Sequence, residues 1–186
     1  MSNPKHHDDT GSAARKASSV WKRLNEGYDP AGSQPTGSYL LVLSAYGGLA
    51  GILLLIGRKL NGNKSVRIPV GDLVLIALAT QRLSRLVAKD PLTSPLRMPF
   101  TKYVGVSGES ELAEEVRGEG IQRVVGELLS CPFCVGQWIA TVFTFGMVVA
   151  PGLTRIVTGV FAGRAAADFL QLAYAAAQER FEQQSS

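Results

Sequence analysis

The sharpest chemical motif in the sequence is a pair of cysteines, Cys131 and Cys134, separated by Pro132 and Phe133. Two thiols at this spacing suit a structural turn at a helix entry, a redox dithiol, or half of a tetrahedral metal site. Cys134 stands at the start of an apolar helix, where the helix dipole favours a thiolate and is expected to lower the pKa of the thiol. We favour the structural turn, then redox chemistry, then metal binding.

A single chain is expected to hold neither a cofactor nor a metal. The run Cys-Pro-Phe-Cys resembles a glutaredoxin active site over four residues only, because a thioredoxin-like fold needs strands around the motif and an apolar helix follows here. Zinc needs four ligands, and the only histidines, His6 and His7, lie in the N-terminal tail. A dimer would be needed to bring four cysteines together.

A second group of candidates consists of charges set in or beside apolar segments. Arg164 and Asp168 are four residues apart, so they share a helix face and can neutralise each other. Asp168 can instead pair with Arg82 or Arg85, which border another apolar segment. Such charges are candidates for a proton or ion relay, but a pair without further polar residues makes a poor conduction path. We therefore favour a clamp between helices.

A loop motif follows these arginines. Asp90 and Pro91 end a helix and turn the chain, and Arg97 lies a few residues further on. Lys89 and the arginines before it could hold lipid phosphates or this loop. Residues 109–117 are predicted to form a short acidic surface helix. The sequence has no phosphate-binding glycine loop, no Ser-His-Asp set and no nucleotide-binding fingerprint, and we expect no nucleic-acid partner.

Apolar helices are the elements that must position these residues. The chain has 186 residues, 46% of them hydrophobic and 18% charged. Residues 39–56 are uncharged and extend about 27 Å as a helix, close to the thickness of a bilayer core, so residues 39–57 are assigned as the first transmembrane helix. Residues 70–89 can just span if their arginines reach the interface, and an interfacial amphipathic helix is the alternative. Residues 131–153 and 156–177 form two further runs, joined as an antiparallel hairpin.

The N-terminal tail, residues 1–38, has the composition of a disordered segment. Val20, Trp21, Leu24 and Tyr28 nevertheless share one helical face, with basic residues beside it. This pattern fits equally a short helix on an anionic membrane surface and a solvated tail with chance periodicity.

Charge asymmetry indicates the orientation. With four spans, the N-terminus, a loop over residues 90–130 and the C-terminus share one side, and their Lys and Arg residues place that side in the cytoplasm. The basic loop at residues 57–69 argues for the opposite orientation. Two Gly-x-x-x-Gly pairs, Gly47/Gly51 and Gly159/Gly163, would let helices approach closely.

Several short motifs occur in order at residues 82–86 (Arg-Leu-Ser-Arg-Leu), 90 (Asp), 94–97 (Ser-Pro-Leu-Arg), 99–100 (Pro-Phe), 127–138 (Glu-Leu-Leu-Ser-Cys-Pro-Phe-Cys-Val-Gly-Gln-Trp) and 168–171 (Asp-Phe-Leu-Gln). Together they resemble an uncharacterised bacterial membrane family, domain of unknown function 1360. The resemblance covers residues 70–177, and the segment before them looks like an addition. It implies a small polytopic membrane protein of an actinobacterial type or of a phage of such a host, and it implies no established activity.

These observations predict an all-α fold: a polytopic bundle of three to four transmembrane helices with a disordered N-terminal tail and a membrane domain over residues 70–177. The lack of a reaction constellation favours a non-enzymatic interaction or assembly factor of the bacterial cytoplasmic membrane. Its expected contacts are the lipid bilayer and a second copy or another membrane protein. The alternatives are a thiol redox protein or sensor that uses Cys131 and Cys134, and a small oligomeric transporter or channel.

Overall fold

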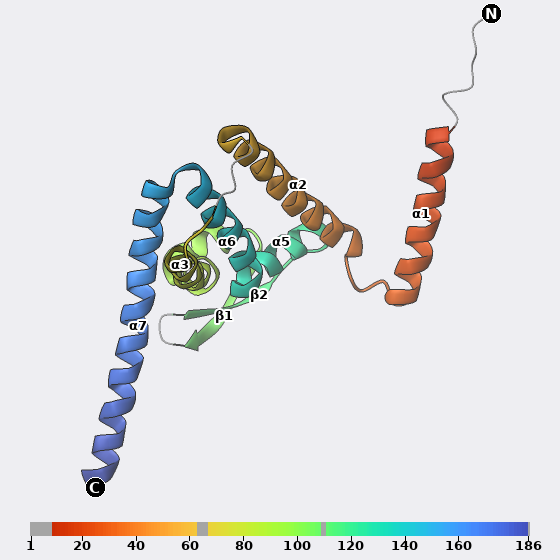
Figure 1. Ribbon diagram of the computed structural model, residues 1–186. Helices are drawn as coiled ribbons and strands as arrows, with labels where there is room; N and C mark the ends of the chain where they lie inside the picture. Colours follow the sequence, from red (N-terminus) through yellow and green to blue (C-terminus); the bar gives the residue numbers. More distant parts are fainter. Residues whose placement is uncertain (1–8, 63–66, 109–110, 186) are drawn as a thin grey trace, which may run out of the picture.

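The computed structural model describes residues 9–62, 67–108 and 111–185, and these residues are mostly helical (Figure 1). This part of the chain contains seven α-helices, one 3₁₀ turn and two strands. Their bounds are α1 Asp9–Tyr28, α2 Thr36–Asn61, α3 Val70–Lys89, η1 Pro91–Thr93, α4 Ser94–Arg97, β1 Thr101–Gly108, β2 Glu111–Val116, α5 Gly120–Ser130, α6 Pro132–Val149 and α7 Pro151–Ser185.

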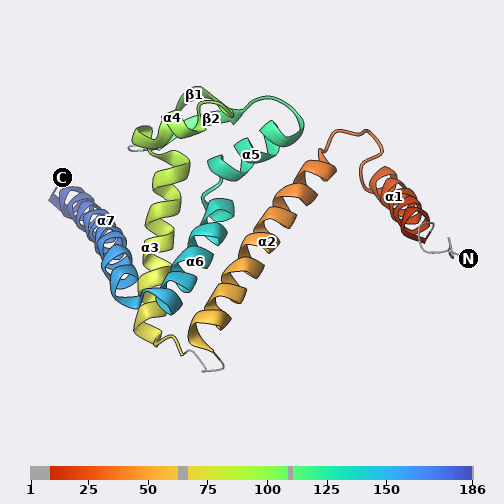
Figure 2. The same cartoon turned by 90° about the horizontal axis from the view of Figure 1, so that it is seen from above.

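The first helix, α1, begins at Asp9, within the segment that the composition predicts to be disordered. A hydrogen-bonded turn joins it to α2. Asp29 accepts a hydrogen bond from the backbone N–H of Gln34 at 2.5 Å, and the Thr36 hydroxyl bonds the side chain of Asn25. Figure 2 shows α1 turning away from the start of α2 at this point.

The central helix of the bundle is α3, which packs against α6 on one side and α7 on the other. Its Ile76 and Ala79 form a buried cluster with Phe143 and Met147 of α6. The helix α2 lies on the far side of α6 and also contacts α5 (Figure 2). Close packing of these apolar side chains gives dispersion contacts that hold α3 against α6.

Among the described residues, three helical segments are long and apolar enough to cross a membrane: Thr36–Leu60, Pro132–Val149 and Pro151–Gln183. The helix α3, which was expected from the sequence to be just able to span, is not one of them, because it carries Asp72, Arg82, Arg85 and Lys89. One face of α3 is nevertheless buried against its neighbours, and it carries both polar and apolar side chains, including Asp72 and Ser84, while Leu73 and Val74 are exposed.

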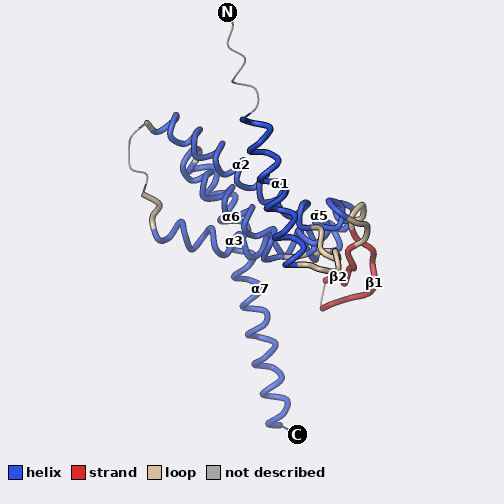
Figure 3. The backbone as a smooth tube through the Cα atoms, turned by 90° about the vertical axis from the view of Figure 1, so that its right-hand side faces the viewer, coloured by secondary structure: helices blue, strands red, loops and turns tan. Residues whose placement is uncertain are grey.

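The connection between α6 and α7 is a single residue, Ala150. A Cβ atom on Gly146 would lie 2.6 Å from the Thr154 hydroxyl, so the missing side chain lets the two helices meet. From there the helices diverge, instead of lying side by side as an antiparallel hairpin (Figures 1 and 2). Figures 1 and 3 show α7 crossing α3 and continuing well beyond the bundle to the C-terminus.

We call residues 90–130 the cap. Its described residues, 90–108 and 111–130, are folded and lie at one end of the helices (Figure 2). The cap contains the antiparallel pair β1 and β2, with Thr101 opposite Val116 and Lys102 opposite Glu115. The all-α prediction is therefore wrong in this segment, as is the helix predicted over residues 109–117. Pairing with β1 overrides the helix propensity of Glu, Leu and Ala in β2.

The cap closes where α5 meets the strands. A Cβ atom on Gly126 would lie 2.7 Å from Val116 Cγ1 and 2.8 Å from the Phe100 carbonyl oxygen, so this helix position requires glycine. The positive φ angles of Gly118 (81°) and Gly120 (56°) turn the chain from β2 into α5. The contact at Gly126 packs α5 closely against the strands, and α5 ends at Ser130, directly before Cys131.

Candidate functional site

The charged residues predicted to clamp the helices do meet between α3 and α7. The Asp168 carboxylate lies 2.6 Å from Arg164 Nη1 on its own helix and 3.3 Å from Arg82 Nε on α3. Arg82 Nε is buried and lacks the alignment for a hydrogen bond, so its contact with Asp168 is electrostatic. One carboxylate therefore faces two guanidinium groups, and the two pairings considered from the sequence occur together.

A second ion pair joins the opposite end of α3 to α7. Arg155 donates two parallel hydrogen bonds to Asp72, from Nε at 2.9 Å and from Nη2 at 2.7 Å. This pair was not predicted from the sequence. A signal was present, since each residue is an isolated charge at the edge of an apolar run, but which two of the scattered charges meet depends on how α7 crosses α3.

Arg97 is the best-connected side chain of the cap, and it is fully buried. Its Nε and Nη2 donate to the two oxygens of Glu114 on β2, at 2.7 and 3.1 Å. Its Nη1 donates to the Val87 carbonyl at 2.6 Å, and Nη2 donates to the Asp90 carbonyl at 3.2 Å. Arg97 thereby satisfies carbonyl groups at the end of α3 that have no partner within the helix, and ties them to the sheet.

Asp90 and Arg85, which were also singled out from the sequence, use their side chains in other contacts. The Asp90 carboxylate accepts the backbone N–H of Leu92 at 2.9 Å and so starts the short turn η1. Arg85 does not reach Asp168 and pairs instead with Glu111 of β2. The partners Glu111 and Glu114 were missed from the sequence, because their segment was assigned to a surface helix.

The two cysteines lie at the junction of α5 and α6 (Figure 2). Their Sγ atoms are 2.8 Å apart and both thiols are free. Cys131 is the N-cap of α6, and its Sγ accepts the backbone N–H of Cys134 at 3.3 Å. Cys134 is exposed and Cys131 is half-buried, while Phe133 between them is 91% exposed. The pair is thus both closely spaced and accessible.

The electrostatic environment activates Cys131. Burial raises the pKa of the Cys131 thiol, but hydrogen bonds from Cys134 and Phe133 and the positive charge of Lys89 outweigh it, so the pKa lies below its ordinary value. The sequence analysis expected the activated thiol at Cys134, from the dipole of the helix. The structure corrects this, because the N-cap side chain is the one toward which the first N–H groups of α6 point.

Polar contacts also link α2 to α6 inside a largely apolar interface. The Tyr46 hydroxyl accepts a hydrogen bond from Gln137 Nε2 at 2.8 Å and lies 2.9 Å from the Thr141 hydroxyl. The Tyr46 ring packs edge-to-face on Trp138, with centroids 5.3 Å apart. The polar residues four apart in an apolar run were the available signal for this interface.

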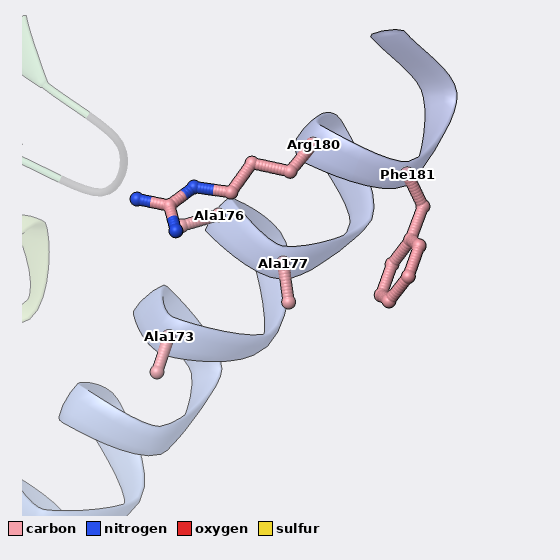
Figure 4. Close-up of a pocket in the computed structure, with 5 residues that line it drawn as sticks. All are labelled: Ala173, Ala176, Ala177, Arg180 and Phe181. Atoms are coloured by element: carbon pink, nitrogen blue, oxygen red, sulfur yellow. The ribbon is translucent and has the colours of Figure 1, made fainter. Parts of the chain in front are cut away.

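In the described part of the chain, no three His, Cys, Asp or Glu side chains gather where they could hold a metal ion. The hollow shown in Figure 4 has a volume of about 470 Å³. It is lined by α7 alone, with Arg180 and Phe181 pointing to different sides of the helix, so it does not surround a ligand.

Comparison with known proteins places the chain. Residues 75–174 match a family described as "Protein of unknown function (DUF1360)". The sporulation protein YjcA of Bacillus subtilis (strain 168) is 35% identical over 82 residues, which cover 42% of this chain and 70% of that protein. No solved structure matches the chain. Because the family match spans more than half of the residues, the chain belongs to this family of unknown function, DUF1360.

Proposed function

We propose that the chain is a small integral membrane protein without enzymatic activity, which acts as an interaction or assembly factor through its cap. The observation that carries the proposal is the buried pair of Arg97 with Glu114, which fixes the cap to the end of α3. Both side chains are almost completely withdrawn from solvent, at 0% and 7% exposed. A segment held in this way presents a surface of defined shape.

The surface that the cap presents is partly apolar. Leu92, Leu96 and Met98, on and next to η1 and α4, are 81%, 65% and 66% exposed. Exposed apolar side chains that gather on a folded segment are typical of contact sites for a protein or a membrane surface. We place the contact with another membrane protein or a second copy of the chain here.

The proposed location is the bacterial cytoplasmic membrane, with the cap and both termini on the cytoplasmic side. Three helices have the length and composition to span, and on α2 Leu43, Leu54 and Leu55 are each more than 60% exposed, as side chains facing lipid would be. The start of α2 and the cap lie at the same end of the helices (Figure 2). Since α3 runs back to the cap, this arrangement supports a topology in which α3 crosses as a fourth span, packed against α6 and α7.

The ion pairs between α3 and α7 favour a structural role over conduction. Asp168 is paired with both Arg82 and Arg164, and Asp72 is paired with Arg155. Charges that neutralise each other across a helix interface stabilise packing. This supports the assembly factor over the transporter or channel. The name of the Bacillus relative connects that protein with sporulation, and for this chain we propose only the interaction role.

The experiment is complementation of a strain that lacks the gene. Leu92→Glu and Leu96→Glu place charges on the proposed contact surface without touching the Arg97 network, so both variants should fail to complement while accumulating in the membrane. Lys102→Gln, which changes the charge on the exposed side of β1 without placing a like charge opposite Glu115, is the control and should complement. Complementation by both leucine variants at normal protein levels would refute the proposal.

Orientation is tested separately by labelling the cysteines in intact cells. A membrane-permeant maleimide should modify Cys131 and Cys134, and an impermeant one should not, if the cap faces the cytoplasm. Modification by the impermeant reagent would place the cap outside and reverse the proposed topology.

A further inference from the structure

We propose that Cys131 and Cys134 are a functional dithiol that closes reversibly to an intramolecular disulfide by exchange with a disulfide-bearing partner. This activity goes beyond the interaction role proposed above and does not depend on it. The first observation is proximity: the two Sγ atoms are 2.8 Å apart and both cysteines are reduced. A disulfide bond is about 2.05 Å long, so closure requires only a small movement of the two side chains.

The backbone already has the conformation that closure needs. Cys131 precedes the helix in an extended conformation (φ −101°, ψ 108°), which turns its side chain over the first turn of α6. Pro132 occupies the first turn, where its fixed φ suits a helix start and its missing N–H costs nothing. Cys134 lies on the same turn, with its N–H directed at Cys131 Sγ. The motif therefore does not need to unfold to change redox state.

Activation and proximity assign different tasks to the two thiols. Cys131 is the attacking group, because its lowered pKa gives it more thiolate at neutral pH. The contribution of Lys89 to that pKa shows that the cationic end of α3 lies close enough to act on the sulfur. Cys134 stands next to Cys131, with its Sγ close enough to attack a mixed disulfide on that residue, as a resolving thiol must.

The exchange balances as follows. The Cys131 thiolate attacks one sulfur of a disulfide R–S–S–R′, forming Cys131–S–S–R and releasing R′–S⁻, which takes up a proton. Cys134 then loses its proton to solvent, attacks Cys131 Sγ and releases R–S⁻, which is protonated in turn. Two cysteine thiols are oxidised to one disulfide, and the partner disulfide is reduced to two thiols. The reverse sequence reduces the protein.

The surroundings fit a protein or small-molecule disulfide as the partner class. The junction is open, and the side chain of Phe133 is 91% exposed directly between the two cysteines. An exposed aromatic ring beside a thiol can pack against the partner while the mixed disulfide exists. In the described residues, no third Cys, His or acidic ligand joins the pair to form a metal site.

The test uses the full chain in lipid nanodiscs, equilibrated with reduced and oxidised glutathione at a series of ratios. Intact mass should fall by two hydrogens per chain in one two-electron transition, without a lasting glutathione adduct. In the Cys134→Ser variant, oxidised glutathione should leave a stable adduct on Cys131. The Cys131→Ser variant should form its adduct more slowly at pH 7, by about threefold for each unit of pKa that separates the thiols, because the larger thiolate fraction of Cys131 is partly offset by the lower nucleophilicity of a more acidic thiolate.

Folding does not confound this test. Serine is a good N-cap residue, so Cys131→Ser keeps an acceptor at the start of α6. The adduct rates are measured again in denaturant, where the two monothiol variants should become equal. Persistence of both thiols at every glutathione ratio would overturn the proposal. Equal adduct rates in the folded variants, or thiols that a zinc chelator alone exposes to alkylation, would also overturn it.

Discussion

Replacing Arg97 with methionine would test how the cap is attached to α3. The side chain is fully buried, and its guanidinium group donates to Glu114 and to the carbonyl groups of Val87 and Asp90. Methionine keeps much of the volume and removes the charge, which leaves Glu114 buried without its partner. Breaking a buried ion pair in this way costs about 3–5 kcal/mol.

The loss should appear first as local opening of the cap, because Arg97 joins the end of α3 to β2. Backbone amides of β1 and β2 should therefore exchange with deuterium faster by roughly a hundred- to several-thousand-fold, since about 1.4 kcal/mol corresponds to a factor of ten. Amides in the middle of α6, which pack on α3 through Phe143 and Met147, should change little. Hydrogen-exchange mass spectrometry of the protein in nanodiscs measures both.

Arg85→Met is the matched control, because Arg85 pairs with Glu111 of the same strand but its side chain is 48% exposed. Such a pair contributes about 0–1 kcal/mol, so exchange in the sheet should rise by no more than about fivefold. The double variant Arg97→Met, Glu114→Leu removes both buried charges and should exchange more slowly than Arg97→Met alone. Equal exchange in the two arginine variants would refute the reasoning.

Three further predictions concern other contacts. Asp168→Asn should lower the thermal unfolding temperature in detergent, because two guanidinium groups lose their counter-charge, whereas Glu26→Gln, in an exposed pair on α1, should leave it unchanged. Gly126→Ala should destabilise the protein by about 1–3 kcal/mol in denaturant titration, since its Cβ would meet the backbone of the cap, while Gly47→Ala, with open space around it, should be neutral or stabilising by up to about 1 kcal/mol. Trp21 fluorescence, measured with the other tryptophan replaced by phenylalanine, should shift to shorter wavelength in anionic but not in neutral nanodiscs if α1 lies on the lipid surface, and an identical spectrum in both would indicate a solvated helix.

The helices could be predicted from the sequence because their signals are local. An uncharged run around residues 39–56 becomes α2, and Gly62, with φ 59°, ends it. The pairing of Asp168 with Arg164 follows from a spacing of four residues on one helix. The same logic located both cysteines at the start of α6. In each case, the information lies within one or two helical turns.

The cap could not be predicted in this way, since its structure depends on contacts between distant residues. Glu114 is a strand residue because β2 pairs with β1, and it is buried because Arg97 binds it. The pairing of Asp72 with Arg155 joins residues on separate helices, whose crossing no periodicity reveals. The choice of the activated thiol also needed the backbone of Cys131, which the helix pattern alone does not define.

The central position of α3 has a consequence for how the chain enters a membrane. Under the proposed placement, α2, α6 and α7 are apolar enough to partition into lipid one at a time, as each leaves the ribosome. The helix α3 is synthesised early, yet the residues that neutralise Asp72 and Arg82, namely Arg155 and Asp168, belong to the last helix. Until α7 has been synthesised, each buried charge of α3 costs at least about 2.5–3.5 kcal/mol in lipid. The last helix, α7, therefore supplies the counter-charges that α3 needs in lipid, and α3 inserts stably only when synthesis is almost complete.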